Sequence, residues 1–190
     1  LLGIRRMKQY VGNCSDVIDW NAVVESIKNS EPAYQGPRHT KQDDLPGIKE
    51  ISESWDKAGY TLKSEGGTIG WDMCIPETNF DRSVVEKFAD YVGVDVLSCW
   101  VSVVHQGNHA PWHWDTQDNE EELCKLNNIE RFHVHMEDTH PGHVLIVEDD
   151  LYYNAKAGDV YKWPDRNAWH AGSNCGQRPK YIFNFFGTKR

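Results

Sequence analysis

Residues 96–115 read VLSCWVSVVHQGNHAPWHWD, two short runs rich in β-branched and aromatic residues on either side of the polar segment QGN. Such runs, when Gly and Asn bound them, are typical of strands that are joined by turns. The pattern continues along the chain and predicts eight strands, at residues 96–105, 112–115, 129–137, 143–148, 151–155, 159–163, 169–172 and 180–186. Eight short strands in succession indicate a β-sandwich or barrel rather than a parallel α/β sheet.

Residues 7–93 follow a different pattern, in which apolar residues recur at helical spacing. The spacing predicts three helices, at residues 16–30, 48–58 and 82–92. Ser15 or Asp16 can cap the first helix, and Gly93 can end the third. We therefore expect one domain, mainly β and of the α+β class, in which a mostly helical part packs on a β core formed by residues 94–190.

The chain has 190 residues and a mass of 21.9 kDa, which fits a single domain. Its 20 basic and 29 acidic side chains give a net charge of −9, so nucleic acid and anionic membranes are disfavoured as partners. The sequence contains neither an apolar run of about 18 residues nor a secretory signal pattern. The five cysteines form no C-x-x-C pair, which favours a reducing compartment. We expect a cytoplasmic protein, whose oligomeric state does not follow from the sequence.

The histidines carry the clearest chemical signal, because eight of the nine lie between residues 105 and 170. His113 and Asp115 are two residues apart, so in an extended chain both side chains point to one face and can bind one metal ion. His170 is the best candidate for a third ligand. Two imidazoles and one carboxylate suit non-haem Fe(II) and leave positions for an organic acid and dioxygen, which a closed zinc site lacks.

A 2-oxo acid that chelates this metal needs a cation for its far carboxylate, since an unpaired buried carboxylate is costly. Arg178 follows His170 by eight residues and is the favoured anchor. Arg131 and His133 alternate with apolar residues and share a strand face, so they can hold a second carboxylate. The residues alone leave open how the two arginines divide this work.

HWD at 113–115, RFHVHM at 131–136, GDVYKWPDRNAWHAGSN at 158–174 and Arg178 together resemble the 2-oxoglutarate and Fe(II)-dependent dioxygenases. The resemblance is closest to the aspartyl/asparaginyl β-hydroxylase branch, which includes proline 3-hydroxylases. It implies a double-stranded β-helix, a cupin-like jelly roll, buttressed by the N-terminal helices. It also implies iron bound by His113, Asp115 and His170, with Arg178, Arg131 and His133 at 2-oxoglutarate. The 18 residues from His113 to Arg131 exceed the spacing expected for the branch.

The function implied by this resemblance is hydroxylation of an unactivated C–H bond with Fe(II), 2-oxoglutarate and dioxygen, on an amino acid that is free or within a peptide. The alternative is a non-catalytic, cupin-like module that binds a metal or small molecule, with zinc or nickel at His133, His135 and His170. The acidic residues 116–125 form a solvated loop or select a cationic or peptide substrate. Trp112 and Trp114 serve in core packing or as a wall of the cavity.

Overall fold

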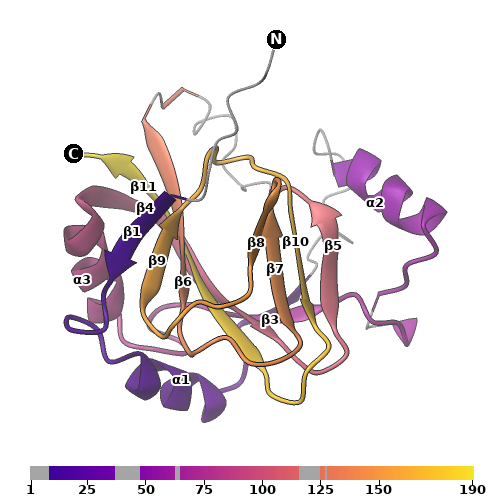
Figure 1. Cartoon of the computed structure of the whole chain (residues 1–190), viewed down its shortest axis with the longest axis horizontal. Coiled ribbons are helices and arrows are strands. Elements are labelled where there is room, and N and C mark those ends of the chain that lie inside the picture. The colour runs from indigo at the N-terminus through magenta and orange to yellow at the C-terminus, as the bar shows by residue number, and fades with distance from the viewer. Residues whose placement is uncertain (1–8, 37–47, 63–64, 116–124, 127) are drawn as a thin grey trace.

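The computed structural model describes residues 9–36, 48–62, 65–115, 125–126 and 128–190. Within these residues the chain forms eleven strands, arranged in two antiparallel sheets, and three helices (Figure 1). The strands of the C-terminal half are β4 (Val94–Val104), β5 (His109–His113), β6 (Ile129–His135), β7 (His143–Val147), β8 (Asp150–Tyr152), β9 (Asp159–Lys162), β10 (His170–Asn174) and β11 (Lys180–Lys189).

The order of these eight strands is that of a jelly roll. β9, β6, β11 and β4 lie side by side in the larger sheet, and β5, β10, β7 and β8 form the smaller sheet. Successive strands cross from one sheet to the other, except at the hairpin of β7 and β8. The predicted mainly β, jelly-roll fold with N-terminal helices is therefore confirmed. All eight predicted strands are present, but β5 begins earlier than predicted and ends at His113, so Asp115 follows the strand.

The N-terminal part contains α1 (Trp20–Lys28), α2 (Ile48–Lys57) and α3 (Ser83–Val92), together with β1 (Gln9–Asn13), β2 (Tyr34–Gly36) and β3 (Trp71–Cys74). The three helices were predicted, and α3 ends at Gly93, whose φ of 72° glycine adopts without strain. The three strands were not predicted. They extend both edges of the larger sheet, where β1 pairs with β9 and β3 pairs with β4. Because β1 is largely exposed, its sequence shows no apolar alternation.

The cap of α1 differs from the prediction. Asp19, rather than Ser15 or Asp16, precedes the first helical turn and accepts a hydrogen bond from the backbone N–H of Ala22 at 3.1 Å. The predicted cap was wrong because residues 14–18 form a separate turn before the helix starts. The helix is consequently shorter at its N-terminus than its apolar spacing indicated.

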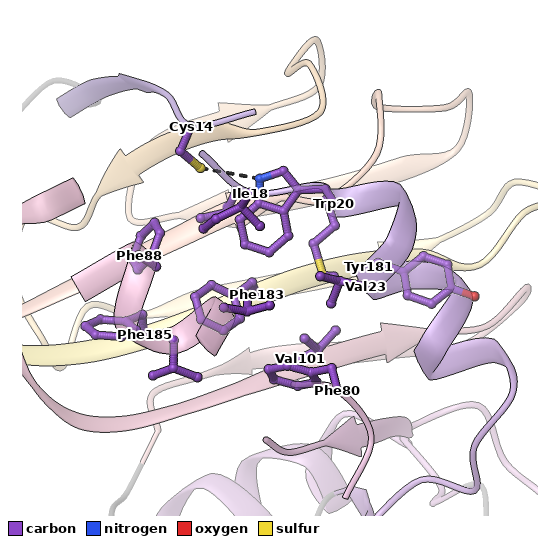
Figure 2. Packing of buried hydrophobic residues seen from close by; sticks show 14 of the residues in the cluster. Cys14, Ile18, Trp20, Val23, Phe80, Phe88, Val101, Tyr181, Phe183 and Phe185 are labelled. Atoms are coloured by element: carbon purple, nitrogen blue, oxygen red, sulfur yellow. Dashed lines mark hydrogen bonds between the residues drawn. The ribbon is translucent and has the colours of Figure 1, made fainter. Parts of the chain in front are cut away.

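The main hydrophobic core lies on the outer face of the larger sheet, under α1 and α3 (Figure 2). Phe88 of α3 packs edge to face against Phe183 and Phe185 of β11, with ring centroids 5.2 and 5.0 Å apart. Trp20 of α1 is buried beside them and donates a hydrogen bond from Nε1 to the Cys14 sulfur at 3.4 Å. These large buried rings fix which face of the sheet turns toward the helices.

The packing of this core also determines which side chains of β11 point away from the helices. Side chains alternate along a strand, so Phe183 and Phe185 point to the helices while Lys180, Ile182 and Asn184 point between the two sheets. The interior of the jelly roll therefore receives an ammonium and an amide from the same strand. This alternation positions part of the candidate site.

Candidate metal centre and cavity

His113, Asp115 and His170 come together at one end of the smaller sheet. β5 and β10 pair with His113 opposite His170, and the two ring centroids are 4.2 Å apart. Asp115 Oδ1 lies 3.4 Å from His113 Nε2, and Asp115 Oδ2 lies 3.5 Å from His170 Nε2. One possible ligand atom from each residue lies within 4.8 Å of the others. The arrangement thus offers two nitrogens and one carboxylate to a single ion.

Backbone carbonyls orient both imidazoles. His113 Nδ1 lies 2.6 Å from the carbonyl oxygen of Pro111, and His170 Nδ1 lies 3.0 Å from that of Ala168. A carbonyl oxygen only accepts, so Nδ1 donates in each ring, and Nε2 is the nitrogen that faces Asp115. Such tethering of the distal nitrogen is the usual support of a metal-binding histidine. The residues present therefore fit a divalent transition metal.

The charges at the centre favour metal binding near neutral pH. Burial, followed by the nearby His113, holds the pKa of His170 well below its usual value, so this ring is neutral. Burial disfavours the Asp115 carboxylate, but opposing interactions, of which the Arg131 charge is the largest, outweigh burial and hold the pKa of Asp115 well below its usual range. A neutral imidazole and an ionised carboxylate are the protonation states that a metal ligand requires.

Arg131 lies behind the metal centre. It is 1% exposed, and its Nη2 donates a hydrogen bond to Asp115 Oδ2 while its Nη1 donates to the carbonyl oxygen of Arg166 at 3.2 Å. The guanidinium carbon lies 3.4 Å from the ring centroid of Trp163 and 4.8 Å from that of Phe186. Burial lowers the pKa of Arg131 to about 10. The sequence predicted that Arg131 binds an anionic ligand, whereas the structure pairs it with the Asp115 carboxylate.

His133 is fully buried beside the same indole. Its Nδ1 accepts a hydrogen bond from Trp163 Nε1 at 2.6 Å, and its Nε2 has no hydrogen-bond partner among the described residues. Burial, and next the nearby His135, hold the pKa of His133 well below its usual value. Among the described residues, the one group of three possible ligands that could share a metal ion is His113, Asp115 and His170. The alternative metal set of His133, His135 and His170 does not form such a group.

Arg178, the favoured anchor for the far carboxylate, has an exposed side chain and does not line the described cavity. Its backbone holds the turn before β11, since its carbonyl oxygen accepts hydrogen bonds from His143 Nε2 at 2.8 Å and Asn174 Nδ2 at 2.7 Å. Arg178 therefore lies outside the group of residues that line the described cavity, and its role at a co-substrate stays a prediction. The turn directs this side chain to solvent.

A cavity lies between the two sheets and opens beside the metal centre. Its empty volume, including the open mouth, is about 510 Å³. His113, Asp115 and His170 form one part of its lining. Most of the remaining wall is apolar and is made by residues such as Trp71, Trp163, Leu145 and Ile182. The candidate metal ligands therefore border a mostly apolar cavity.

Lys180 supplies a buried cation to this cavity. The residue is 4% exposed, and its Nζ donates hydrogen bonds to the carbonyl oxygens of Val144 at 2.5 Å and Ser173 at 3.3 Å. Burial lowers the pKa of Lys180 to about 7. Gly172 leaves the space beside it, since a Cβ there would lie 3.1 Å from Nζ. Lys180 was not predicted from the sequence, because residues 181–183 are all apolar and alternation alone leaves open which face of the strand points inward.

The two tryptophans that flank His113 have different surroundings. Trp112 is 43% exposed and stacks on Trp169, with centroids 6.3 Å apart. Trp114 packs against the cluster that contains Trp55 and Trp71, so it serves in core packing.

The acidic stretch at residues 116–125 lies almost entirely outside the described residues. Within those residues, no helix is both long and apolar enough to cross a membrane.

Several solved structures resemble this chain. The chain resembles AviO1 from Streptomyces viridochromogenes Tue57 with a TM-score of 0.52 and 11% identity, over 95% of this chain and 88% of that one. A viral collagen prolyl hydroxylase from Paramecium Bursaria Chlorella virus-1, in complex with 2OG, matches at a TM-score of 0.47 and 14% identity, over 76% and 92% of the two chains. A Pseudomonas putida prolyl-4-hydroxylase matches at 0.40 and 12% identity, over 90% and 99%.

Some of the other matches are partial. The chain spans 62% of the plu4264 protein from Photorhabdus luminescens, with 48% of its own length, a TM-score of 0.34 and 11% identity. No protein-family model and no curated protein matches the sequence. At identities this low the likeness to solved structures shows the fold alone, which is the antiparallel jelly roll described above.

Proposed function

We propose that this protein is an Fe(II)- and 2-oxoglutarate-dependent dioxygenase that hydroxylates an unactivated C–H bond. The observation that carries the proposal is the convergence of His113, Asp115 and His170 on a cavity that also contains the buried ammonium of Lys180. Two imidazoles and one carboxylate bind one face of an octahedral ion and leave sites for a bidentate acid and dioxygen. A closed four-ligand site would leave no such positions.

The residues of the chain have separate roles in this proposal. His113 and His170 would bind Fe(II) through Nε2, because their Nδ1 atoms are tethered to carbonyls. Asp115 would supply the anionic ligand, and Arg131 keeps it ionised and oriented. When bound, the iron and 2-oxoglutarate reduce dioxygen and supply the oxidising power for hydroxylation, with release of succinate and carbon dioxide.

Lys180, in place of Arg178, would pair with the far carboxylate of 2-oxoglutarate. Gly172 follows His170 by two residues on β10, so both positions face the cavity, about 7 Å apart along the strand. The lack of a side chain at residue 172 gives the diacid a path from the metal centre to the Lys180 ammonium.

The apolar wall would then exclude water from the reacting centre. Trp71 stacks on the His113 ring with centroids 5.8 Å apart, and Trp163 packs edge to face on His170 at 4.7 Å. We propose an amino acid, free or within a peptide, as the substrate. This proposal is supported by the resemblance of residues 113–178 to the aspartyl/asparaginyl β-hydroxylase branch.

Anaerobic titration tests the proposed co-substrate chemistry. Adding 2-oxoglutarate to the protein with one equivalent of Fe(II) should produce the weak visible charge-transfer band of a chelated 2-oxo acid. The band should disappear in Asp115→Ala and in His170→Ala, and remain in Arg190→Met, whose exposed side chain pairs with Asp90. Succinate release in air, screened over amino acids and short peptides, then identifies the substrate.

A tightly bound metal without a charge-transfer band or succinate would contradict the proposal. That result would favour the cupin-like binding module.

A further inference from the structure

Aromatic rings connect the metal centre to the protein surface. Trp163 packs edge to face against the candidate ligand His170, with centroids 4.7 Å apart, and is itself buried. On its other side, its Nε1 donates the 2.6 Å hydrogen bond to His133 Nδ1. Trp163, which lies next to the proposed iron site, is thus hydrogen-bonded to His133, which lies farther from that site.

The series continues outward through two tyrosines. The His133 ring stacks on Tyr161, with centroids 5.2 Å apart and an interplanar angle of 19°. Tyr161 of β9 lies opposite Tyr10 of β1 in the sheet register, and the two rings are 5.4 Å apart. Tyr10 is 56% exposed. Every step of the series is therefore a ring contact or a hydrogen bond, and the series ends in solvent.

The end of the series also has a proton acceptor. Tyr10 donates a hydrogen bond from its hydroxyl to Asp159 Oδ1 at 3.2 Å. Asp159 is held in place by Asn13 Nδ2 at 2.9 Å and by the backbone N–H of Lys156 at 2.8 Å. A phenol that loses an electron also loses its proton, so a fixed carboxylate at Tyr10 favours oxidation of this ring.

We propose that Trp163, His133, Tyr161 and Tyr10 form an electron path that protects the metal centre, and that Tyr10 is the residue at which stray oxidation ends. The inference rests on the iron site of the proposed function and does not require 2-oxoglutarate. Its electron source is the Tyr10 phenol. Its oxidant is an oxygen-centred radical of the hydroxyl class, formed from hydrogen peroxide and ferrous iron.

The proposed oxidation proceeds through successive one-electron transfers from ring to ring. Trp163 gives one electron to the radical, which also takes a proton from solvent and becomes water. Tyr161 then gives one electron to the oxidised Trp163 indole across His133, and Tyr10 gives one electron to the oxidised Tyr161. The Tyr10 O–H bond breaks, its proton passes to Asp159, and a neutral phenoxyl radical remains. Two such radicals from two chains join through one carbon–carbon bond, and the hydrogen on each bonding ring carbon then moves as a proton to the oxygen of the same ring, which restores both phenols.

The test uses the full chain loaded with one equivalent of Fe(II) and treated with hydrogen peroxide. Peptide mass spectrometry measures oxidation at each tyrosine, and electron paramagnetic resonance of frozen samples detects the phenoxyl radical. Tyr153 is the internal reference, because it is 66% exposed and lies outside the path. Oxidation of Tyr10 should exceed that of Tyr153 several-fold, whereas the Zn(II)-loaded protein should show no such preference.

Tyr161→Phe interrupts the path while keeping a ring stacked on His133. Oxidation of Tyr10 should fall to the level of Tyr153, and oxidation of Trp163 and the ligand histidines should rise. The matched control, Tyr153→Phe, should leave the Tyr10 signal unchanged. Equal oxidation of the two tyrosines, or no effect of Tyr161→Phe, would overturn the inference.

The outcomes also separate this inference from the proposed function. Selective Tyr10 oxidation in a protein that does not bind 2-oxoglutarate would support the path and overturn the proposed function. Iron binding with unselective oxidation would overturn the path alone. Failure to bind iron, measured by metal titration, would overturn both.

Discussion

Arg131 donates a hydrogen bond to Asp115, so the buried arginine of β6 is paired with the carboxylate of the candidate metal centre. The stacking of its guanidinium on Trp163 fixes the arginine from the other side. Arg131 is therefore a positioning residue for Asp115, and its charge is compensated within the fold. The cation that remains for a ligand in the described cavity is Lys180.

Arg131→Met should destabilise the metal-free protein by about 3–5 kcal/mol, because it leaves the Asp115 carboxylate partly buried without its partner. Urea unfolding at neutral pH measures this loss. Since the folded-state pKa of Asp115 is lowered, the stabilisation is complete above about pH 4 and is lost as the pH falls further. The difference in the free energy of unfolding between the variant and the wild type should become smaller as the pH falls over that range.

Arg190→Met is the matched control for this substitution. Arg190 pairs with Asp90 at 2.9 Å and with Asp95 at 3.0 Å on the exposed surface. Its loss should cost about 0–1 kcal/mol, as for other exposed pairs. Equal losses in Arg131→Met and Arg190→Met would contradict the positioning role of Arg131.

Lys180→Met should weaken 2-oxoglutarate binding about 10- to 100-fold, since a hydrogen bond to a charged group contributes about 1.5–3 kcal/mol. Arg178→Met should change the affinity by about twofold at most, as expected for an exposed side chain. Isothermal titration with the Fe(II)-loaded protein under argon measures both. A larger loss in Arg178→Met than in Lys180→Met would return the anchor role to Arg178.

The affinity for 2-oxoglutarate should depend on pH through the same lysine. Burial lowers the pKa of Lys180 to about 7 in the free protein, and only the charged ammonium attracts the far carboxylate. Above this pH the dissociation constant should therefore rise about tenfold per pH unit. Lys180→Arg keeps its charge throughout, so its affinity should not change over this range. An identical pH profile in both proteins would exclude Lys180 as the titrating group.

The pH dependence of stability follows from the same lowered pKa. Between pH 7 and the ordinary lysine pKa of about 10.4, the unfolded chain binds more protons at Lys180 than the folded chain does. Stability should consequently rise with pH over this range in the metal-free protein. Lys180→Met should remove this rise, and chemical unfolding at a series of pH values detects the change.

The strands and the pairing of His113 with Asp115 could be predicted because both depend on local patterns, whereas the jelly roll was implied by the family resemblance. Alternating residues mark the strands, and His113 and Asp115 are close along the chain. The cations could not be assigned in the same way. Whether Arg178 or Lys180 points inward depends on the turn that precedes β11. The pairing of Arg131 with Asp115 joins β6 of the larger sheet to the segment that follows β5 of the smaller sheet.

The missed strand β1 shows the same limit. Its residues are mostly exposed, so pairing with β9 rather than apolar alternation makes it a strand. Its position nevertheless brings Tyr10 against Tyr161, a contact between residues that are far apart in sequence. Local sequence patterns identify helices and strands that bury one face, whereas an exposed edge strand can be recognised only from its pairing with the neighbouring strand.

Gly172→Val should block the path from the metal centre to Lys180 without preventing folding. Even a Cβ at residue 172 would lie 3.1 Å from Lys180 Nζ, and the two methyl groups of valine would fill the space beyond it. The flexible lysine side chain can move aside, and valine favours strands, so the variant should retain its thermal unfolding transition. Its affinity for 2-oxoglutarate should fall at least as far as that of Lys180→Met, while Fe(II) affinity stays unchanged. Ala171→Val on the neighbouring position of β10, which does not line the cavity, should leave both affinities intact. Wild-type 2-oxoglutarate binding in Gly172→Val would show that the co-substrate does not pass along β10.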